Sequence, residues 1–176
     1  IIGNQNNATY KEIFHLIKEN KIWLGYKSGN MAFKVPANSK ERKTRFWIDE
    51  SGQKWRSLGN ICWYTNLDIP KRHDNLPLYK TYSPEEYPTY DNYDAININK
   101  TADIPCDFDG VMGVPITFLD KYSPEQFDIL GMSASAGYNP DIVGIPFKGE
   151  KDARPLIHGK NTYARVLIQK RKQSEQ

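Results

Sequence analysis

Ile1 to Leu24 combine two apolar runs with an amphipathic segment between them. Ile1-Ile2-Gly3 predicts the end of a buried strand, and Ile22-Trp23-Leu24 predicts a second, short strand. Residues 10–20 predict a helix whose apolar positions recur at spacings of three, four and seven: Tyr10, Ile13, Phe14 and Ile17. Strand, helix, strand is a parallel α/β unit, and such units lie in sheets covered on both faces. The expected fold class is therefore α/β.

Further strands are predicted from apolar runs and the turns between them. "RFWID" and "KWRSL" flank the turn sequence "ESGQ" and predict a small hairpin. An apolar, aromatic run predicts a strand at residues 61–67, which Pro70 closes off. Residues 114–119 predict another strand, and "YARVLIQK" predicts the last one. Residues 70–110, rich in Pro, Tyr and Asp, predict a layer of ordered loops, because their aromatic content argues against disorder.

A second helix is predicted from its capping residues. Ser123 fits an N-cap, Pro124 fits the first helical position, and Gly131 fits the end of the helix. The same tetrapeptide, "YSPE", occurs at 82–85 and 122–125, and we interpret both copies as helix starts rather than as an internal repeat. Residues 132–162 are loop-like.

The charge is unevenly distributed along the chain, although the net charge is only +3. Residues 1–60 carry +6, residues 61–130 carry −7 and residues 131–176 carry +4. Residues 27–59 alone hold eight Lys and Arg against three acidic residues, a net charge of +5. Opposed blocks of this kind predict one basic face. Such a face fits a polyanionic partner, and it also fits ordinary solvated charge.

No complete catalytic, metal-binding or membrane-spanning pattern is present. No apolar run approaches the roughly 18 residues that a membrane span needs, and Asn139-Pro140 lacks the second Pro and the aromatic of an amino-methyltransferase tetrapeptide. Cys62 and Cys106, without CxxC spacing, predict two buried reduced thiols and a cytosolic protein. The acidic cluster of Asp103, Asp107 and Asp109 fits a cation site or, more commonly, solvated loop and cap chemistry. We expect no metal.

Several long segments together resemble one family. They are "IIGNQN", "IKENKIWLGY", "GQKWRSLGNICWYTNLD", "YPTYDNYDAINI", "DFDGVMGVPITFLDKYSPEQFDILG" and "YARVLIQKRK". In this order, over nearly the whole chain, they are similar to the C-terminal half of the EcoRI-type adenine-specific DNA methyltransferases. The resemblance implies S-adenosylmethionine as methyl donor and the exocyclic amine of a DNA adenine as acceptor. It also implies a cytoplasmic, bacterial or phage-encoded protein of a restriction–modification setting.

The resemblance also implies what precedes residue 1. Members of the family carry a glycine-containing cofactor loop and an Asn-Pro-Pro-Phe-type tetrapeptide before this point, and neither is in the sequence. We therefore expect a fragment, in which Ile1 lies in the fifth strand of a Rossmann-like sheet and the cofactor-binding residues lie upstream. Such a fragment is expected to be inactive alone, to bind no S-adenosylmethionine, and to self-associate through its exposed sheet edge at residues 1–2 and 22–24.

On this basis the chain has three parts. Residues 1–67 hold the last strands and helix of the methyltransferase sheet, with the basic insertion at 27–59. Residues 68–172 form a loop-rich C-terminal region specific to the family, and residues 173–176 form a frayed tail.

The insertion supplies the candidate residues for contact with double-stranded DNA. They are Lys34, Lys40, Arg42, Lys43, Arg45 and Arg56. For any one arginine, contact with a phosphate is the more common role and guanine recognition the alternative. The resemblance also points to an aromatic residue that covers the flipped adenine, with Phe33 as the first candidate and Tyr64 as the second, and core packing as the alternative for each. Trp47 and Trp55 fit either packing or a wedge.

Two other functions stay open at this point. One is a stand-alone, non-enzymatic DNA-binding module that carries the basic insertion without a catalytic half. The other is a structural or assembly domain, which is expected to bind no DNA at any salt concentration.

Overall fold

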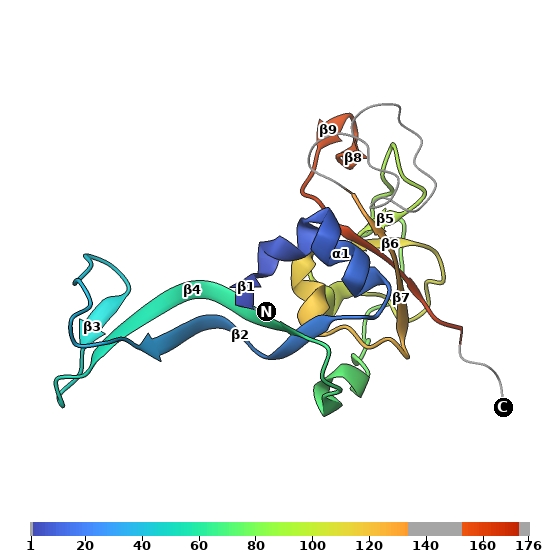
Figure 1. The fold of residues 1–176 in the computed structure, drawn as a ribbon. Helices are drawn as coiled ribbons and strands as arrows, with labels where there is room; N and C mark the ends of the chain where they lie inside the picture. The colour runs from blue at the N-terminus through green and yellow to red at the C-terminus, as the bar shows by residue number, and fades with distance from the viewer. Residues whose placement is uncertain (1, 134–152, 173–176) are drawn as a thin grey trace.

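The computed structural model describes residues 2–133 and 153–172, and it contains two four-stranded sheets, one α-helix and a small hairpin (Figure 1). The first sheet holds β1 (Ile2–Asn4), β2 (Trp23–Lys34), β3 (Phe46–Ile48) and β4 (Lys54–Thr65). The second holds β5 (Ile96–Asn97), β6 (Met112–Val114), β7 (Phe127–Met132) and β10 (Val166–Lys170). β8 (Leu156–Ile157) pairs with β9 (Lys160–Asn161). Ile1, Asn139-Pro140 and the predicted tail at 173–176 lie outside the described residues.

The predicted first helix is confirmed as α1 (Lys11–Lys18), which follows a 3-10 turn, η1 (Gln5–Thr9). Phe14 and Ile17 are buried, as their spacing on one helix face predicts. The helix ends because Asn20 adopts a left-handed backbone, with φ of 55°. The amide of Lys21 then donates to the carbonyl of Leu16 at 2.8 Å, which satisfies one of the free carbonyls of the last turn.

In the first sheet, the order of strands is β1, β4, β2. β1 and β2 both run antiparallel to β4, so they run parallel to one another with β4 between them. The strand–helix–strand unit of the sequence prediction is therefore present, but its two strands are not neighbours. The mixed α/β class is confirmed.

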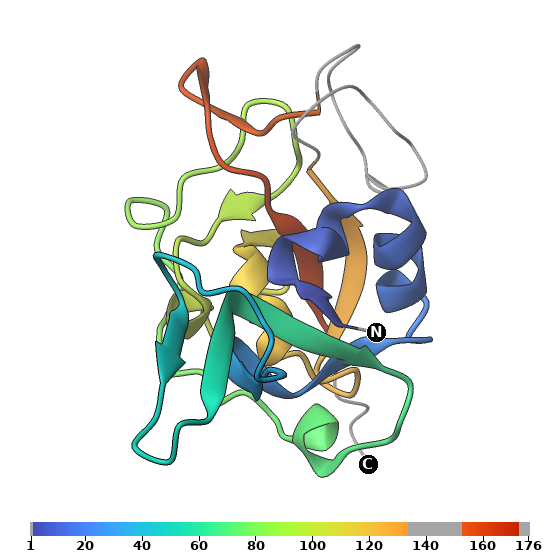
Figure 2. The same cartoon turned by 60° about the vertical axis from the view of Figure 1, so that its left-hand side comes forward.

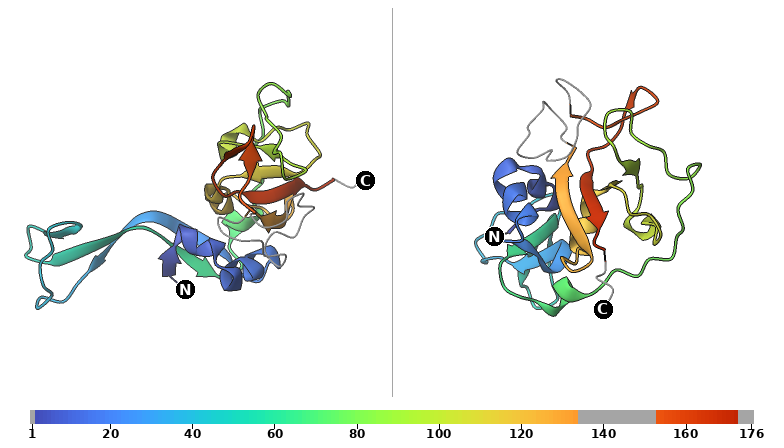
Figure 3. Two further views of the ribbon diagram at one scale, coloured as in Figure 1. Left: turned by 90° about the horizontal axis from the view of Figure 1, so that it is seen from above. Right: turned by 90° about the vertical axis from the view of Figure 1, so that its right-hand side faces the viewer.

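β2 and β4 extend well beyond the rest of the first sheet. Each is 12 residues long, which corresponds to about 40 Å of extended chain at roughly 3.3 Å per residue. β3 pairs with the outer part of β4. We call residues 27–59 the arm, and it projects from the remainder of the molecule in Figure 1 and in the view from above at the left of Figure 3.

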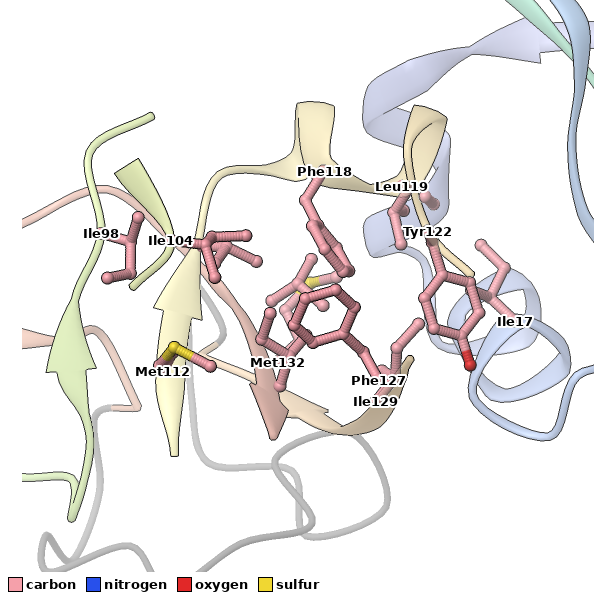
Figure 4. Close-up of a cluster of buried hydrophobic side chains, with 14 of the residues drawn as sticks. Ile17, Ile98, Ile104, Met112, Phe118, Leu119, Tyr122, Phe127, Ile129 and Met132 are labelled. Carbon is pink, nitrogen blue, oxygen red and sulfur yellow. The ribbon is translucent and has the colours of Figure 1, made fainter. Parts of the chain in front are cut away.

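One hydrophobic cluster joins α1, the base of the first sheet and the second sheet (Figure 4). At its centre, the rings of Phe118 and Phe127 meet edge to face, with centroids 5.3 Å apart. Ile17 of α1 and Cys62 of β4 belong to the same cluster as Met132 of β7.

The division of the chain into two parts at residue 67 stays a prediction. No residue between 31 and 59 belongs to either buried cluster, so the arm is peripheral to the core.

The prediction of a helix from Ser123 to Gly131 is wrong. A single turn follows Ser123, and the chain then enters β7, which pairs with β10 (Figure 2). The other "YSPE" copy also makes only one turn, in which the amides of Glu86 and Tyr87 both donate to the Ser83 carbonyl. No helix follows this turn directly. The capping residues are therefore genuine turn signals, but tertiary pairing determines the next element.

The strand predicted at residues 114–119 is correct only at its start. β6 ends at Val114, Pro115 follows, and residues 116–120 form a 3-10 turn, η4 (Ile116–Asp120). Proline has no amide to donate to a neighbouring strand, so the ladder stops there. The loop layer at 70–110 is confirmed in outline. It contains two short 3-10 turns, η2 (Pro70–His73) and η3 (Thr101–Asp103), beside β5.

The two cysteines differ in their environment. Cys62 is buried and free, as predicted, and burial raises the pKa of its thiol. Cys106 is also free, but the prediction that it is buried is wrong. It lies in the loop that follows η3, where its backbone amide donates to the Lys80 carbonyl at 2.8 Å and its side chain is left exposed.

Candidate nucleic-acid interface

The register of the first sheet shows where the arm leaves the molecule. Asn4, the last residue of β1, and Gly29 of β2 are both paired with Ile61 of β4. β1 stops at this level, whereas β2 continues to Lys34 in the same direction. The arm therefore extends past the carboxyl end of β1. In open α/β sheets, ligands bind in the crevice outside the carboxyl ends of the parallel strands.

The outer arm has two different faces, because residues paired across neighbouring strands lie on the same side of a sheet. Lys34, Trp55 and Trp47 are paired in a row and form what we call the tryptophan face. The two indole rings are stacked with centroids 6.3 Å apart, and the Lys34 ammonium lies 5.6 Å from the Trp55 ring centroid. Phe33, Arg56 and Phe46 are paired in the adjacent row and form the opposite, phenylalanine face.

Five of the six predicted DNA-contacting residues are exposed, and all six lie on the arm. The exposed residues are Lys34, Lys40, Arg42, Lys43 and Arg45. Arg56 is half-buried in the middle strand of the phenylalanine face. Lys54 differs from these, because its ammonium contacts the Ser39 carbonyl at 3.2 Å and the Glu41 carboxylate at 3.9 Å. The structure thus brings the predicted cations together at the outer end of the molecule.

One acidic residue of the arm, Asp49, binds groups of the arm itself. Asp49 accepts hydrogen bonds from the Ser51 hydroxyl at 2.6 Å and from the Trp55 indole at 2.8 Å. These bonds, the Ser51 bond first, lower the pKa of Asp49 to about 2. The carboxylate therefore fixes the turn between β3 and β4, where Gly52 adopts a φ of 79° that favours glycine. Its negative charge is stabilised by hydrogen bonds from the turn and from the Trp55 indole.

The two base-stacking candidates lie in different environments. Phe33 is half-buried on the arm. Tyr64 is only 3% exposed, and its hydroxyl donates to the carbonyls of Asn4 at 3.0 Å and Gln5 at 3.1 Å. Burial raises the pKa of the Tyr64 phenol, so it stays protonated and anchors the end of β1 to β4. Of the two, only Phe33 lies on the arm.

Sequence reasoning missed three polar residues at the inner end of the arm. Asn30, Ser57 and Asn60 line a groove together with Arg45 and Trp47. Asn30 and Asn60 are paired across β2 and β4. Because asparagine is common in turns and loops, neither residue by itself predicts a site. The available signal was the pair of glycines beside them, which a strand interior seldom contains.

The remaining candidates have structural roles. Asp107 accepts a hydrogen bond from the Tyr82 amide at 2.7 Å, and Asp109 lies 3.4 Å from the Lys170 ammonium. Across residues 2–133 and 153–172, no three His, Cys, Asp or Glu side chains come together in an arrangement that fits a metal ion. None of the helices in the same residues has the length and apolar character that crossing a membrane requires.

Several known proteins are similar to this chain over nearly its whole length. The family model described as "Adenine-specific methyltransferase EcoRI" matches residues 1–171. The chain is 48% identical to the Type II methyltransferase M.EcoRI of Escherichia coli over 98% of its own length and 50% of that protein. It is 34% identical to the Type II methyltransferase M.MgeORF184P of Mycoplasma genitalium and 32% identical to M.MpnI of Mycoplasma pneumoniae, in each case over 97% of this chain and 56% of the relative. The chain thus spans about half the length of these curated relatives. No solved structure matches it.

Proposed function

Because the chain belongs to the Adenine-specific methyltransferase EcoRI family, we propose that it is the DNA-contacting part of an adenine-specific DNA methyltransferase. The complete enzyme would transfer a methyl group from S-adenosylmethionine to the exocyclic amine of an adenine in duplex DNA. The observation that carries this proposal is the basic arm, which extends past the carboxyl end of β1. We place the enzyme in the cytoplasm of a bacterium, encoded by the host or by a phage.

The proposal includes a Rossmann-like sheet in the complete enzyme. β1 and β2 run parallel and are joined through α1, which is the connection that a doubly wound sheet uses. In the described residues, β1 pairs only with β4 and leaves its other edge free. In the complete enzyme, further parallel strands would pair there. In the isolated chain, the same edge would favour self-association.

We assign no residue of this chain to the methyl donor. The end of β1 leads into η1 through a capping box, in which Asn4 and Asn7 each accept a backbone hydrogen bond from the other. A side-chain cap of this kind occupies the amides that a glycine-rich loop would offer to a cofactor. The described residues at the end of β1 therefore do not fit a cofactor loop. We propose that the donor binds elsewhere in the complete enzyme and that this chain alone is inactive.

The arm would act on DNA by charge and by stacking. Lys40, Arg42 and Lys43 lie close together in an exposed loop with no fixed carboxylate partner among the described contacts, so they would neutralise phosphates and release counterions. A base-modifying enzyme must extrude its target base and hold it by stacking. Phe33, half-buried on the phenylalanine face, is the residue that we propose for this contact.

The phosphate contacts can be tested by replacing Lys40, Arg42 and Lys43 with Ala in the complete enzyme. Three lost contacts are expected to reduce the slope of log affinity against log salt by roughly 3 units, from about 0.9 per phosphate. The loss should be similar for every duplex sequence, because phosphates carry no sequence information. Fluorescence anisotropy with a labelled duplex, repeated at several salt concentrations, measures both quantities.

A matched control removes three exposed lysines of the body, Lys11, Lys80 and Lys121, which changes the net charge equally. If the control variant lowers the slope as much as the arm variant does, the effect is one of total charge and the arm is not the interface. If neither variant changes the slope, Lys40, Arg42 and Lys43 contact no phosphates and the role proposed for this loop of the arm is wrong.

A further inference from the structure

The inner end of the arm contains a groove of about 530 Å³ on the side of the tryptophan face. Its lining combines a guanidinium, two amides, a hydroxyl and an indole: Arg45, Asn30, Asn60, Ser57 and Trp47, with Gly59 beside them. This composition differs from that of the outer loop, where exposed lysines and Arg42 predominate. Hydrogen-bonding groups around a flat aromatic wall are suited to a planar polar ligand.

Arg45 is fixed in this groove by its backbone. Its φ is 56°, a left-handed conformation that an arginine rarely adopts. Its carbonyl accepts a hydrogen bond from the Ser57 amide at 3.0 Å, which ties it to β4 one step beyond the paired residues Phe46 and Arg56. The side chain therefore starts from a position that the sheet determines, unlike that of a residue in a free loop.

Gly59 makes room for the Arg45 guanidinium. A Cβ atom at Gly59 would clash with an Arg45 terminal nitrogen and lie 2.7 Å from Cζ, and Gly59 itself has a φ of 76°. The guanidinium lies against this bare backbone and donates one long hydrogen bond, of 3.5 Å, to the Leu58 carbonyl. Among the described residues, no carboxylate pairs with it. Most of its five donors thus have no partner among the described residues.

We infer that Arg45 reads a guanine in the major groove and so determines part of the sequence specificity of the enzyme, an inference that rests on the proposed function. The major groove admits a two-stranded β-ribbon. β2 and β4 form such a ribbon beside the groove, because β3 joins β4 only at Lys54–Arg56. A planar guanidinium matches the O6 and N7 acceptors of guanine bidentately. It matches phosphate as well, so the position of Arg45 in the groove, and not its chemistry alone, favours the base. Asn60, beside it, is of the type that contacts adenine edges, whereas the side-chain oxygen of Asn30 already accepts a hydrogen bond from the Ser57 hydroxyl.

The inference separates Arg45 from its neighbours in the sequence. Arg42 lies only three residues away, but it is in the exposed loop, and no other described residue forms a hydrogen bond or ion pair with its side chain. It therefore serves as a matched control of the same chemistry. Changing either arginine to lysine keeps the positive charge and removes the planar guanidinium that can bind a base edge through two parallel hydrogen bonds.

The experiment uses the complete enzyme and its Arg45→Lys and Arg42→Lys variants. Sequencing of adenine methylation in a plasmid carrying the wild-type gene first defines the recognition sequence. Binding is then measured to the cognate duplex and to duplexes in which each G·C pair in turn is replaced by A·T. R45K is expected to lose about 5- to 150-fold of discrimination at one G·C position. It should keep its affinity for unrelated DNA and its salt slope, and R42K should keep full discrimination at every position.

Gly59→Ala tests the positioning independently, because it displaces the guanidinium without removing it, and we expect it to relax the same position. If R45K fails to fold, Arg45→Gly replaces it, because glycine adopts the positive φ of this position without strain. Arg45→Gly should relax discrimination at the same G·C position. The inference is overturned if these variants retain full discrimination, if they weaken all duplexes equally, or if the recognition sequence contains no G·C pair. A wild-type enzyme that neither binds nor methylates DNA contradicts the proposed function instead.

Discussion

His73 connects two distant parts of the chain through its two ring nitrogens. Nε2 lies 2.6 Å from an Asp68 carboxylate oxygen just beyond β4, and Nδ1 lies 2.7 Å from a Glu125 oxygen just before β7. The hydrogen bonds to Asp68 and Glu125, in that order, raise the pKa of His73 above its usual 6.5. Burial acts to raise the pKa of Glu125, but hydrogen bonds from His73 and Ser123 outweigh it and lower that pKa.

The stabilisation by His73 should depend on pH in a defined direction. A histidine whose pKa is raised by folding contributes fully at pH values below about 6.5, and its contribution is lost as the pH rises through the raised value. Glu125 has the opposite dependence and loses its contribution as the pH falls below about 4.5. We therefore expect the melting temperature of wild type to decline from pH 6.5 upward, and His73→Gln to remove this part of the decline.

Thermal unfolding between pH 5 and pH 9 measures this difference. His158→Asn, in which an exposed imidazole at a positive φ is replaced by a residue that tolerates that backbone, is the control and should behave as wild type. Identical pH profiles for wild type and His73→Gln would show that the contacts of His73 with Asp68 and Glu125 contribute nothing to stability.

At the level of elements, local signals were sufficient where the element is held together locally. α1 was predictable because Phe14 and Ile17 share a helix face and Asn20 supplies a left-handed end. β7 was not predictable. The alternation of buried Phe127 and Ile129 is too short to distinguish a strand from a helical turn, and the partner strand β10 lies much later in the chain. The same tetrapeptide starts one turn in both copies, and only tertiary pairing distinguishes the segments after the two turns.

The candidate site was predictable in its charge but not in its geometry. The cations of the arm are read directly from composition, and the hairpin turn is read from "ESGQ". The contact between Arg45 and Gly59 depends on the pairing of β3 with β4, which places residues 14 positions apart against one another. No local pattern records that contact.

The free edge of β1 leads to a prediction at the same level. Ile2 and Trp63, which are paired across β1 and β4, are 44% and 40% exposed. An unpaired edge beside an apolar pair favours association. The isolated chain should therefore form dimers or larger species as its concentration rises, and Ile2→Lys should shift it toward monomer in sedimentation velocity. Leu67→Lys, at a residue that is 70% exposed outside the strands, should not. A monomer at all concentrations would contradict the proposed edge.

The whole molecule consists of a body that contains the buried clusters and an arm that contributes to neither of them between residues 31 and 59. This separation permits a direct deletion. Replacing residues 31–59 by Asn-Gly would close β2 and β4 at the Asn30–Asn60 pair with a two-residue hairpin turn. Because the core is untouched, we expect the melting temperature of the complete enzyme to stay close to that of wild type.

The central claim is tested most directly by the salt dependence of duplex binding by this deleted enzyme. The deletion removes seven Lys and Arg residues, so the slope of log affinity against log salt should fall by up to roughly 6 units, and methylation of the cognate site should be lost. A folded enzyme that binds duplex DNA with the wild-type affinity and slope after losing the arm would show that the DNA-contacting surface lies elsewhere, and the central claim would be wrong.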